Sequence, residues 1–191
     1  MNVPFYAETS SFQLWTAIAY LTAAALFFSL EKIRWEYFAA GGVCLYIAFD
    51  ERFMFHECIR LTFPTAKKMA NGDMTILVLS LMGIGAAAWG IWQLSSGWVD
   101  RLLYFFAGVI CVQEIYLDVL EKHIFYLELD VKIEEISELV LALLLIFIAI
   151  KAGVKKRALA ILPLLLMIFF VFENHIHTFV WATCPKLKVF K

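Results

Sequence analysis

The sequence predicts an all-α, polytopic membrane protein in which six transmembrane helices form the three hairpins of one bundle. Of the 191 residues, 63% are hydrophobic, and the mean hydropathy is +0.80. Soluble globular domains are usually about 45–50% apolar, so this composition disfavours a soluble fold. Six apolar runs also approach the length of about 20 residues that a membrane span requires. We therefore expect a single integral membrane domain over residues 1–191, in contact with membrane lipids.

Each predicted span is a long apolar run between polar segments. The six runs cover residues 11–30, 37–59, 75–94, 101–123, 134–152 and 158–180. Short connections at 31–36, 95–100 and 151–156 join the spans in pairs, and the longer segments 60–73 and 124–133 separate the pairs. Short connections favour antiparallel neighbours, which gives three helical hairpins. The first 30 residues contain no Lys or Arg, so the signal-peptide pattern is missing and the first run is expected to remain a helix.

Small residues within the second and third spans predict close helix packing. Gly41, Gly83 and Gly90 lie in these spans, where a missing side chain lets two helix backbones approach each other. A shift of 67 positions places Cys44 on Cys111, which suggests a weak internal repeat of the first two hairpins. No C-x-x-C pair occurs among the four cysteines, so a redox dithiol or a zinc ribbon is unsupported.

The charges of the short connections predict the orientation in the membrane. With six spans, both termini lie on one side and the three short connections on the other. Lys155, Lys156 and Arg157 cluster at the last short connection, whereas the N-terminal segment lacks basic residues. Basic residues in short loops favour the cytoplasm, so we expect non-cytoplasmic termini in a bacterial inner membrane. The net charge of −1 gives no reason to expect a nucleic-acid partner.

Carboxylates recur at one depth in four of the predicted spans. Asp50 lies thirteen residues after Tyr37, Glu114 thirteen after Arg101, Glu138 thirteen before Lys151, and Glu173 fifteen after Ala158. A rise of 1.5 Å per residue places each about 20 Å from the short connections, in the non-cytoplasmic half of the membrane. Because ionisable groups are costly to hold in a bilayer, these four residues indicate a functional site.

Further acids and histidines share helix faces with these four carboxylates, at spacings of four or seven residues. Carboxylate and imidazole groups on facing helices are how helical bundles build di-iron and di-manganese sites. We therefore predict one or two bound metal ions, iron first, with manganese, zinc or copper as alternatives. The predicted ligands are Asp50, His56, Glu57, Glu114, Asp118, Glu121, Glu138, Glu173 and His177.

The match to a di-metal bundle is incomplete. The Glu-x-x-His pair of that template does not occur, and Glu173 and His177 are one residue further apart. Acids near the helix ends, such as Glu57 and Glu121, also have a simpler interpretation, because they reach headgroups and water. That interpretation does not extend well to Asp50 or Glu173, which lie deeper in their spans.

The segment Asp50-Glu51-Arg52-Phe53-Met54-Phe55-His56-Glu57 carries a resemblance. It resembles an Asp-(Asp/Glu)-x-Phe-x-x-His-Glu element of small multi-pass bacterial membrane proteins whose function is unassigned. A later acidic helix start in those proteins is similar to Glu134-Glu135 followed by Glu138 here. The resemblance covers about a third of the chain, and it implies a multi-pass membrane fold but no activity.

Three functions are compatible with this pattern. The first is a membrane metalloprotein, such as a di-iron-type oxidoreductase acting on a lipid or a small apolar substrate. The second is a proton or cation transporter, although the half of each span near the short connections is apolar, so no continuous polar path is evident. The third is an accessory subunit that contacts other membrane subunits. Only the metal hypothesis explains carboxylates at matched depth on four helices.

Overall fold

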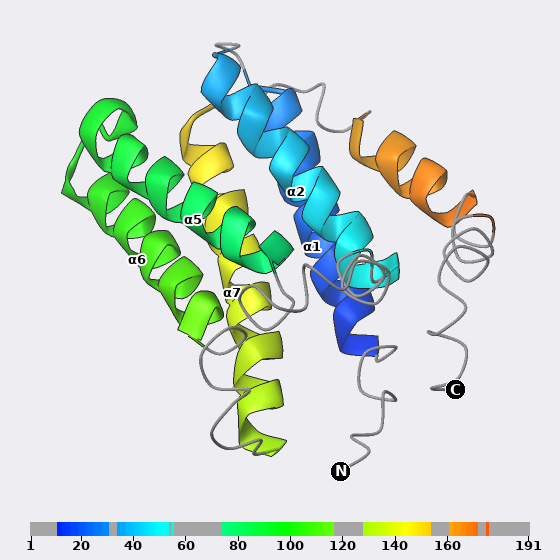
Figure 1. Ribbon diagram of the computed structural model, residues 1–191. Helices are drawn as coiled ribbons and strands as arrows, with labels where there is room; N and C mark the ends of the chain where they lie inside the picture. The colour runs from blue at the N-terminus through cyan, green and yellow to red at the C-terminus, as the bar shows by residue number, and fades with distance from the viewer. Residues whose placement is uncertain are drawn as a thin grey trace. The chain divides into compact units, whose positions relative to one another are not determined.

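The computed structural model describes residues 11–30, 34–53, 55, 74–116, 128–153, 161–171 and 175. Every regular element in these ranges is helical, which confirms the all-α prediction for the described residues (Figure 1). The elements are α1 (Ser11–Phe28), α2 (Trp35–Phe53), α5 (Met74–Trp89), the π-helical turn η3 (Gly90–Leu94), α6 (Trp98–Ile115), α7 (Glu128–Lys151) and a short helix, Ile161–Val171. The chain divides into two compact units: the first comprises Met1–Thr62 and Ala149–Lys191, and the second comprises Phe63–Ile148.

Within the described residues, the helix bounds lie within three residues of the predicted spans except at the start of α7, and the predicted ends at 59, 123 and 180 and the predicted start at 158 lie outside the described residues. We predicted a span from residue 134, but α7 begins at Glu128, so six of the ten residues of the predicted loop 124–133 are helical. The prediction placed the helix start at the apolar run. The helix begins six positions earlier, in a segment that is not a continuous apolar run. At the other end, Gly153 adopts a φ of 95° directly after α7, a left-handed conformation that commonly ends helices.

In the first unit, α1 and α2 form an antiparallel hairpin (Figure 1). Their contacts near the turn are aromatic: the rings of Phe27 and Tyr37 stack with centroids 6.2 Å apart, and those of Phe28 and Phe38 are 5.2 Å apart. Gly41 lies beneath the Phe28 ring, where a Cβ would come within 2.7 Å of Cε1. A glycine at this position therefore lets α2 approach α1 closely.

In the second unit, α5 and α6 form another antiparallel hairpin (Figure 1). Its contacts pair Gly83 with Cys111, Ala87 with Gly108, and Gly90 with the ring of Tyr104. From Gly83 to Gly90 the contacted residue moves back along α6 from Cys111 to Tyr104, as expected for two antiparallel helices. Small residues fill one side of this interface at intervals of three or four, as the sequence predicts.

The two hairpins use the same residues at corresponding positions. Tyr37, Gly41 and Cys44 of α2 correspond, at a shift of 67, to Tyr104, Gly108 and Cys111 of α6. In each hairpin the glycine contacts the preceding helix and the cysteine is buried. The shared packing supports the weak internal repeat that the sequence suggests.

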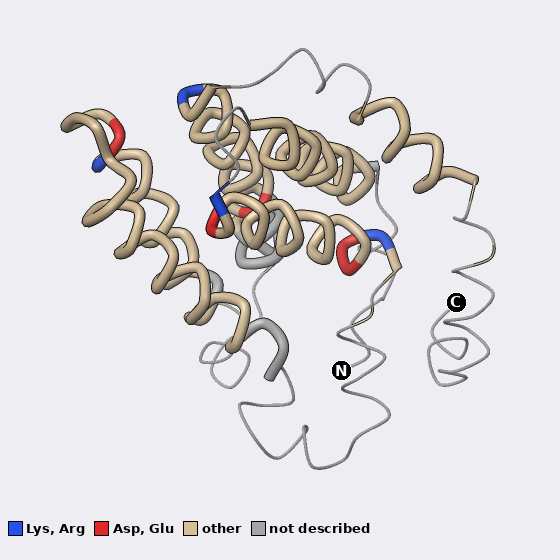
Figure 2. Tube along the Cα trace, turned by 90° about the horizontal axis from the view of Figure 1, so that it is seen from above, with Lys and Arg blue, Asp and Glu red and all other residues tan. Residues whose placement is uncertain are grey.

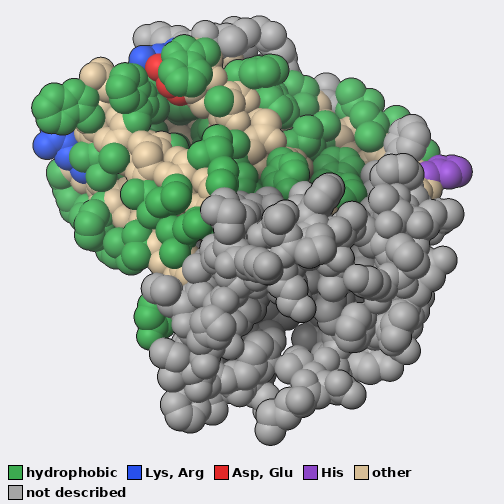
Figure 3. All heavy atoms as spheres, viewed as in Figure 1, with side chains coloured by type: hydrophobic (Ala, Val, Ile, Leu, Met, Phe, Trp, Pro, Cys, Tyr) green, Lys and Arg blue, Asp and Glu red, His purple; other side chains and the backbone are tan. Residues whose placement is uncertain are grey.

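The described helices expose large apolar side chains. Leu77–Leu94 is long and apolar enough to cross a membrane, and among the described helices only this one is. Just 17% of this segment is buried, which is unlike the core helix of a soluble protein. Hydrophobic atoms cover much of the described surface in Figure 3, and Figure 2 shows charged positions mostly towards the helix ends. Such an apolar surface is suited to lipid or to protein partners.

Candidate metal centre

Asp50 is a buried carboxylate near the C-terminal end of α2. Its exposed fraction is 6%, although the helix before it is uncharged from Tyr37 to Phe49. The unbroken helix from Tyr37 to Asp50 gives the predicted distance of about 20 Å along the axis. Burying an ionised carboxylate is unfavourable unless a cation or hydrogen-bond donors compensate. Asp50 therefore has the setting expected of a functional carboxylate.

Aromatic rings enclose this turn of α2. Phe169, from the short helix Ile161–Val171, is fully buried and contacts Phe49 at 5.4 Å and Phe53 at 5.6 Å between ring centroids. These two rings flank Asp50 in the sequence. Glu173 follows Phe169 by four residues in the sequence but lies outside the described residues. The contacts with Phe169 thus bring the end of the described final helix to the turn that carries Asp50.

In the second unit, Glu114 and Glu138 lie at one level of α6 and α7. Cys111 of α6 and Leu141 of α7 belong to one buried cluster, and the two helices run in opposite directions (Figure 1). Glu114 is three residues beyond Cys111, and Glu138 is three residues before Leu141. Both positions therefore lie one turn from the cluster, on the same side of it. The side chain of Glu138 is partly buried, whereas for Glu114 the structure describes the backbone but not the side chain.

Buried hydroxyl groups are the polar residues that our sequence reasoning missed. Ser80 and Ser137 are 7% exposed, and Thr16 is 0% exposed. Ser80 lies three residues before Gly83 on the face of α5 that contacts α6, and Ser137 is next to Glu138. A lone Ser or Thr inside an apolar run is the signal that could have found them, because interhelical hydrogen bonds in membranes often use such residues.

The remaining predicted ligands fall outside the described residues: His56, Glu57, Asp118, Glu121, Glu173 and His177. Within the described ranges, no group of three or more His, Cys, Asp or Glu side chains is arranged to hold a metal ion. Asp50 and Glu138 are the predicted ligands whose side chains are described. His175, which follows Glu173 by two residues, is exposed. The nine-residue ligand set stays a prediction.

The first 152 residues match a protein family described as Domain of unknown function (DUF8692). The chain belongs to this family. The match covers α1, α2, α5, η3, α6 and α7, and it includes Asp50, Glu114 and Glu138. No curated protein and no solved structure matches the chain. The family description assigns no activity, so the chemistry must be inferred from the residues themselves.

The matched region divides the predicted ligands into two groups. Seven of them lie between Asp50 and Glu138, inside the matched residues, whereas Glu173 and His177 lie beyond residue 152. A carboxylate and imidazole set of this kind can bind a divalent or trivalent cation directly. A redox-active metal would supply electron-transfer or oxygen chemistry, and the apolar helices around it would limit the access of water.

Proposed function

We propose that this chain is a multi-pass integral membrane metalloprotein that binds one or two metal ions through carboxylate and histidine side chains. The proposed ligands are the nine residues predicted from the sequence, and the proposed metal is iron first, then manganese, zinc or copper. An oxidoreductase acting on a lipid or a small apolar substrate is the activity that this site favours. The proposed membrane is a bacterial inner membrane, with both termini on its non-cytoplasmic side.

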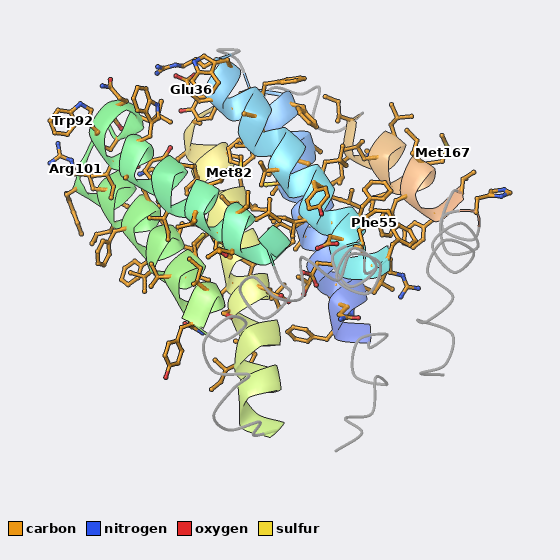
Figure 4. The ribbon with its side chains drawn as sticks, in the orientation of Figure 1. Glu36, Phe55, Met82, Trp92, Arg101 and Met167 are labelled. Carbon is orange, nitrogen blue, oxygen red and sulfur yellow. The ribbon has the colours of Figure 1, made fainter. Side chains whose placement is uncertain are left out.

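The exposed apolar surface supports the membrane part of the proposal. Met82 of α5 and Trp92 of η3 are exposed over 54% and 82% of their surface, and Trp92 lies at the end of the hairpin in Figure 4. Arg101 lies at the same end of the hairpin as Trp92 in this view, as expected where a helix meets headgroups and water (Figure 4). A tryptophan and a charge at the end of an apolar hairpin are characteristic of a membrane interface.

Met82→Lys distinguishes a lipid-facing α5 from a water-facing one. If Met82 faces lipid, a lysine near the middle of the span costs about 3 kcal/mol and strongly reduces the amount of protein recovered from the membrane fraction. Trp92→Lys, at the end of the same segment, is the matched control and should insert nearly as well as the wild type. Equal membrane yields for both variants, measured after an alkaline wash, would overturn the membrane assignment of α5.

The buried Asp50 carries the metal part of the proposal. A carboxylate that is 6% exposed, on a helix with no other charge over its preceding thirteen residues, is costly to place there, and acids in such a setting usually belong to functional sites. Glu138 is a second partly buried carboxylate on an apolar helix, at the level of Glu114. A metal cation compensates several carboxylates at once, which a single arginine such as Arg52 does less well.

Elemental analysis of protein purified without added metal or chelator tests the metal site. We expect about one or two iron, manganese, zinc or copper ions per chain in the wild type. Asp50→Asn and Glu138→Gln keep the side-chain shape but remove the charge, and each should lower the metal content by tenfold or more. Glu36→Gln is the control, because Glu36 pairs with Arg34 at 3.2 Å near the start of α2, far along the helix from Asp50.

Two results would contradict the metal proposal. The first is folded wild-type protein without stoichiometric metal. The second is a metal content that falls equally in all three variants, because the Arg34 and Glu36 pair lies at the opposite end of α2 from Asp50 and should not matter to the site. In either case the accessory-subunit hypothesis becomes the stronger one, and co-purification with a stoichiometric membrane partner would test it.

A further inference from the structure

The α1 and α2 hairpin places a second polar site away from the face that carries Asp50. The aromatic contacts fix the register, since Phe27 stacks on Tyr37 and Phe28 on Phe38. Counting along the two antiparallel helices from these contacts and from Gly41 puts Glu51 opposite residues 13–18 of α1. The polar residues in that stretch are Gln13 and Thr16.

The helical faces agree with this register. Thr16 lies four residues before Tyr20 and eleven before Phe27, so the three share the face of α1 that contacts α2. Glu51 lies seven residues after Cys44 and three after Ala48, and these two are buried on α2. Asp50 is displaced by about 100° from Glu51 around the helix and shares its side with Phe53 instead.

The hydroxyl group of Thr16 is buried and makes no hydrogen bond to any described residue. Its exposed fraction is 0%, and Oγ1 has no hydrogen-bond partner among the described residues. Thr22 on the same helix shows the usual alternative, because its Oγ1 donates a hydrogen bond of 2.8 Å to the carbonyl oxygen of Ile18. Buried hydroxyl groups rarely forgo this bond unless another group occupies them. Something bound between the helices would explain the difference.

We propose that Gln13 and Thr16 of α1, together with Glu51 of α2, form a binding site for a hard divalent cation. The site uses none of the nine ligands of the proposed metal centre. An amide oxygen, a hydroxyl oxygen and a carboxylate are the oxygen donors that Mg²⁺, Ca²⁺ and Mn²⁺ prefer. Oε1 of Gln13 is buried, as is Oγ1 of Thr16, one turn further along the same face.

The charges at this end of the hairpin favour a cation. The N-terminus of α1 and the C-terminus of α2 lie together, so their opposite helix dipoles largely offset each other. The last turn of α2 carries two carboxylates, Asp50 and Glu51, beside the guanidinium of Arg52. Glu51 is partly exposed, so an ion can reach its carboxylate from water.

Binding of Mn²⁺ alone to the full-length chain in detergent tests this site. The titration uses the Glu138→Gln background, in which the proposed metal centre is impaired and the Gln13, Thr16 and Glu51 site is intact. We expect Thr16→Val and Glu51→Gln each to raise the Kd for Mn²⁺ about tenfold or more. Thr16→Ser should keep the affinity, because it keeps the hydroxyl group. Thr22→Val is the matched control and should leave the Kd unchanged.

Stability of the metal-free protein gives a second, independent readout. Thr16→Val replaces an unpartnered hydroxyl group with a methyl group of the same shape, so the Tm without metal should stay the same or rise. Absence of Mn²⁺ binding in the Glu138→Gln background would overturn this site even if wild-type protein contains metal. So would equal affinities of the Thr16→Val and Thr22→Val variants, or a lowered metal-free Tm of Thr16→Val with unchanged Mn²⁺ affinity.

Discussion

Phe169→Ala is expected to lower the free energy of unfolding by about 3 kcal/mol. Phe169 is completely buried, with an exposed fraction of 0%. Its ring contacts Phe49 and Phe53 on α2. Alanine would leave a cavity that the surrounding helices can only partly close. Lipid does not fill such a cavity, so the lost dispersion contacts are not replaced.

Phe170→Ala is the matched control for this prediction. Phe170 is the next residue on the same helix, and 46% of its surface is exposed. Its removal leaves the contacts of Phe169 with α2 intact, so we expect a change within about 0.5–1 kcal/mol. Unfolding of both variants by increasing detergent or denaturant, monitored by helical circular dichroism, gives the comparison. Equal destabilisation would mean that Phe169 does not attach the helix Ile161–Val171 to α2.

The same variant bears on the proposed metal centre. Phe49 and Phe53 flank Asp50, so loosening Phe169 should also loosen the turn that holds this carboxylate. We therefore expect the metal content of Phe169→Ala to fall together with its stability, whereas Phe170→Ala should retain both. A loss of stability without loss of metal would separate the packing of this turn from the ligand role of Asp50.

The sequence predicted the helices well because each is a long apolar run, and apolar runs of this length have few alternatives to a helix. The start of α7 was wrong because the prediction followed hydropathy alone. Residues 128–133 are helical although this segment is not a continuous apolar run. A helix can therefore extend beyond the apolar run that marks its span, and hydropathy does not show where it starts.

The candidate sites were predictable to different degrees. Spacing within one helix shows which residues share a face, so the depth of Asp50 and of Glu138 could be counted from the sequence. The position of Thr16 opposite Glu51 could not, because it depends on the register that Phe27 and Tyr37 set between two helices. Hydroxyl groups were also overlooked because a search for ionisable residues in apolar runs passes over them.

Gly83→Leu is expected to disrupt the α5 and α6 hairpin, with a loss of about 2–3 kcal/mol in unfolding free energy. A Cβ at Gly83 would come within 2.5 Å of Sγ of Cys111, which is closer than any stable contact of this kind. Cys111 is itself buried and belongs to the cluster with Leu141 of α7, so it has little room to move. The two helices must therefore separate, and the cluster must loosen with them.

Gly85→Leu on the same helix decides whether this loss comes from contact or from helix propensity. Both substitutions gain about 0.8–1 kcal/mol of intrinsic helix propensity, but a Cβ at Gly85 meets nothing within 4 Å. Gly85→Leu should thus be neutral or stabilising, and the difference between the two variants isolates the energetic cost of the contact.

Adding Cys111→Ala to Gly83→Leu removes the clashing sulfur and should restore part of the stability, in a double-mutant cycle. If Gly83→Leu is as stable as Gly85→Leu, the close packing of α5 on α6 at Gly83 and Cys111 is wrong.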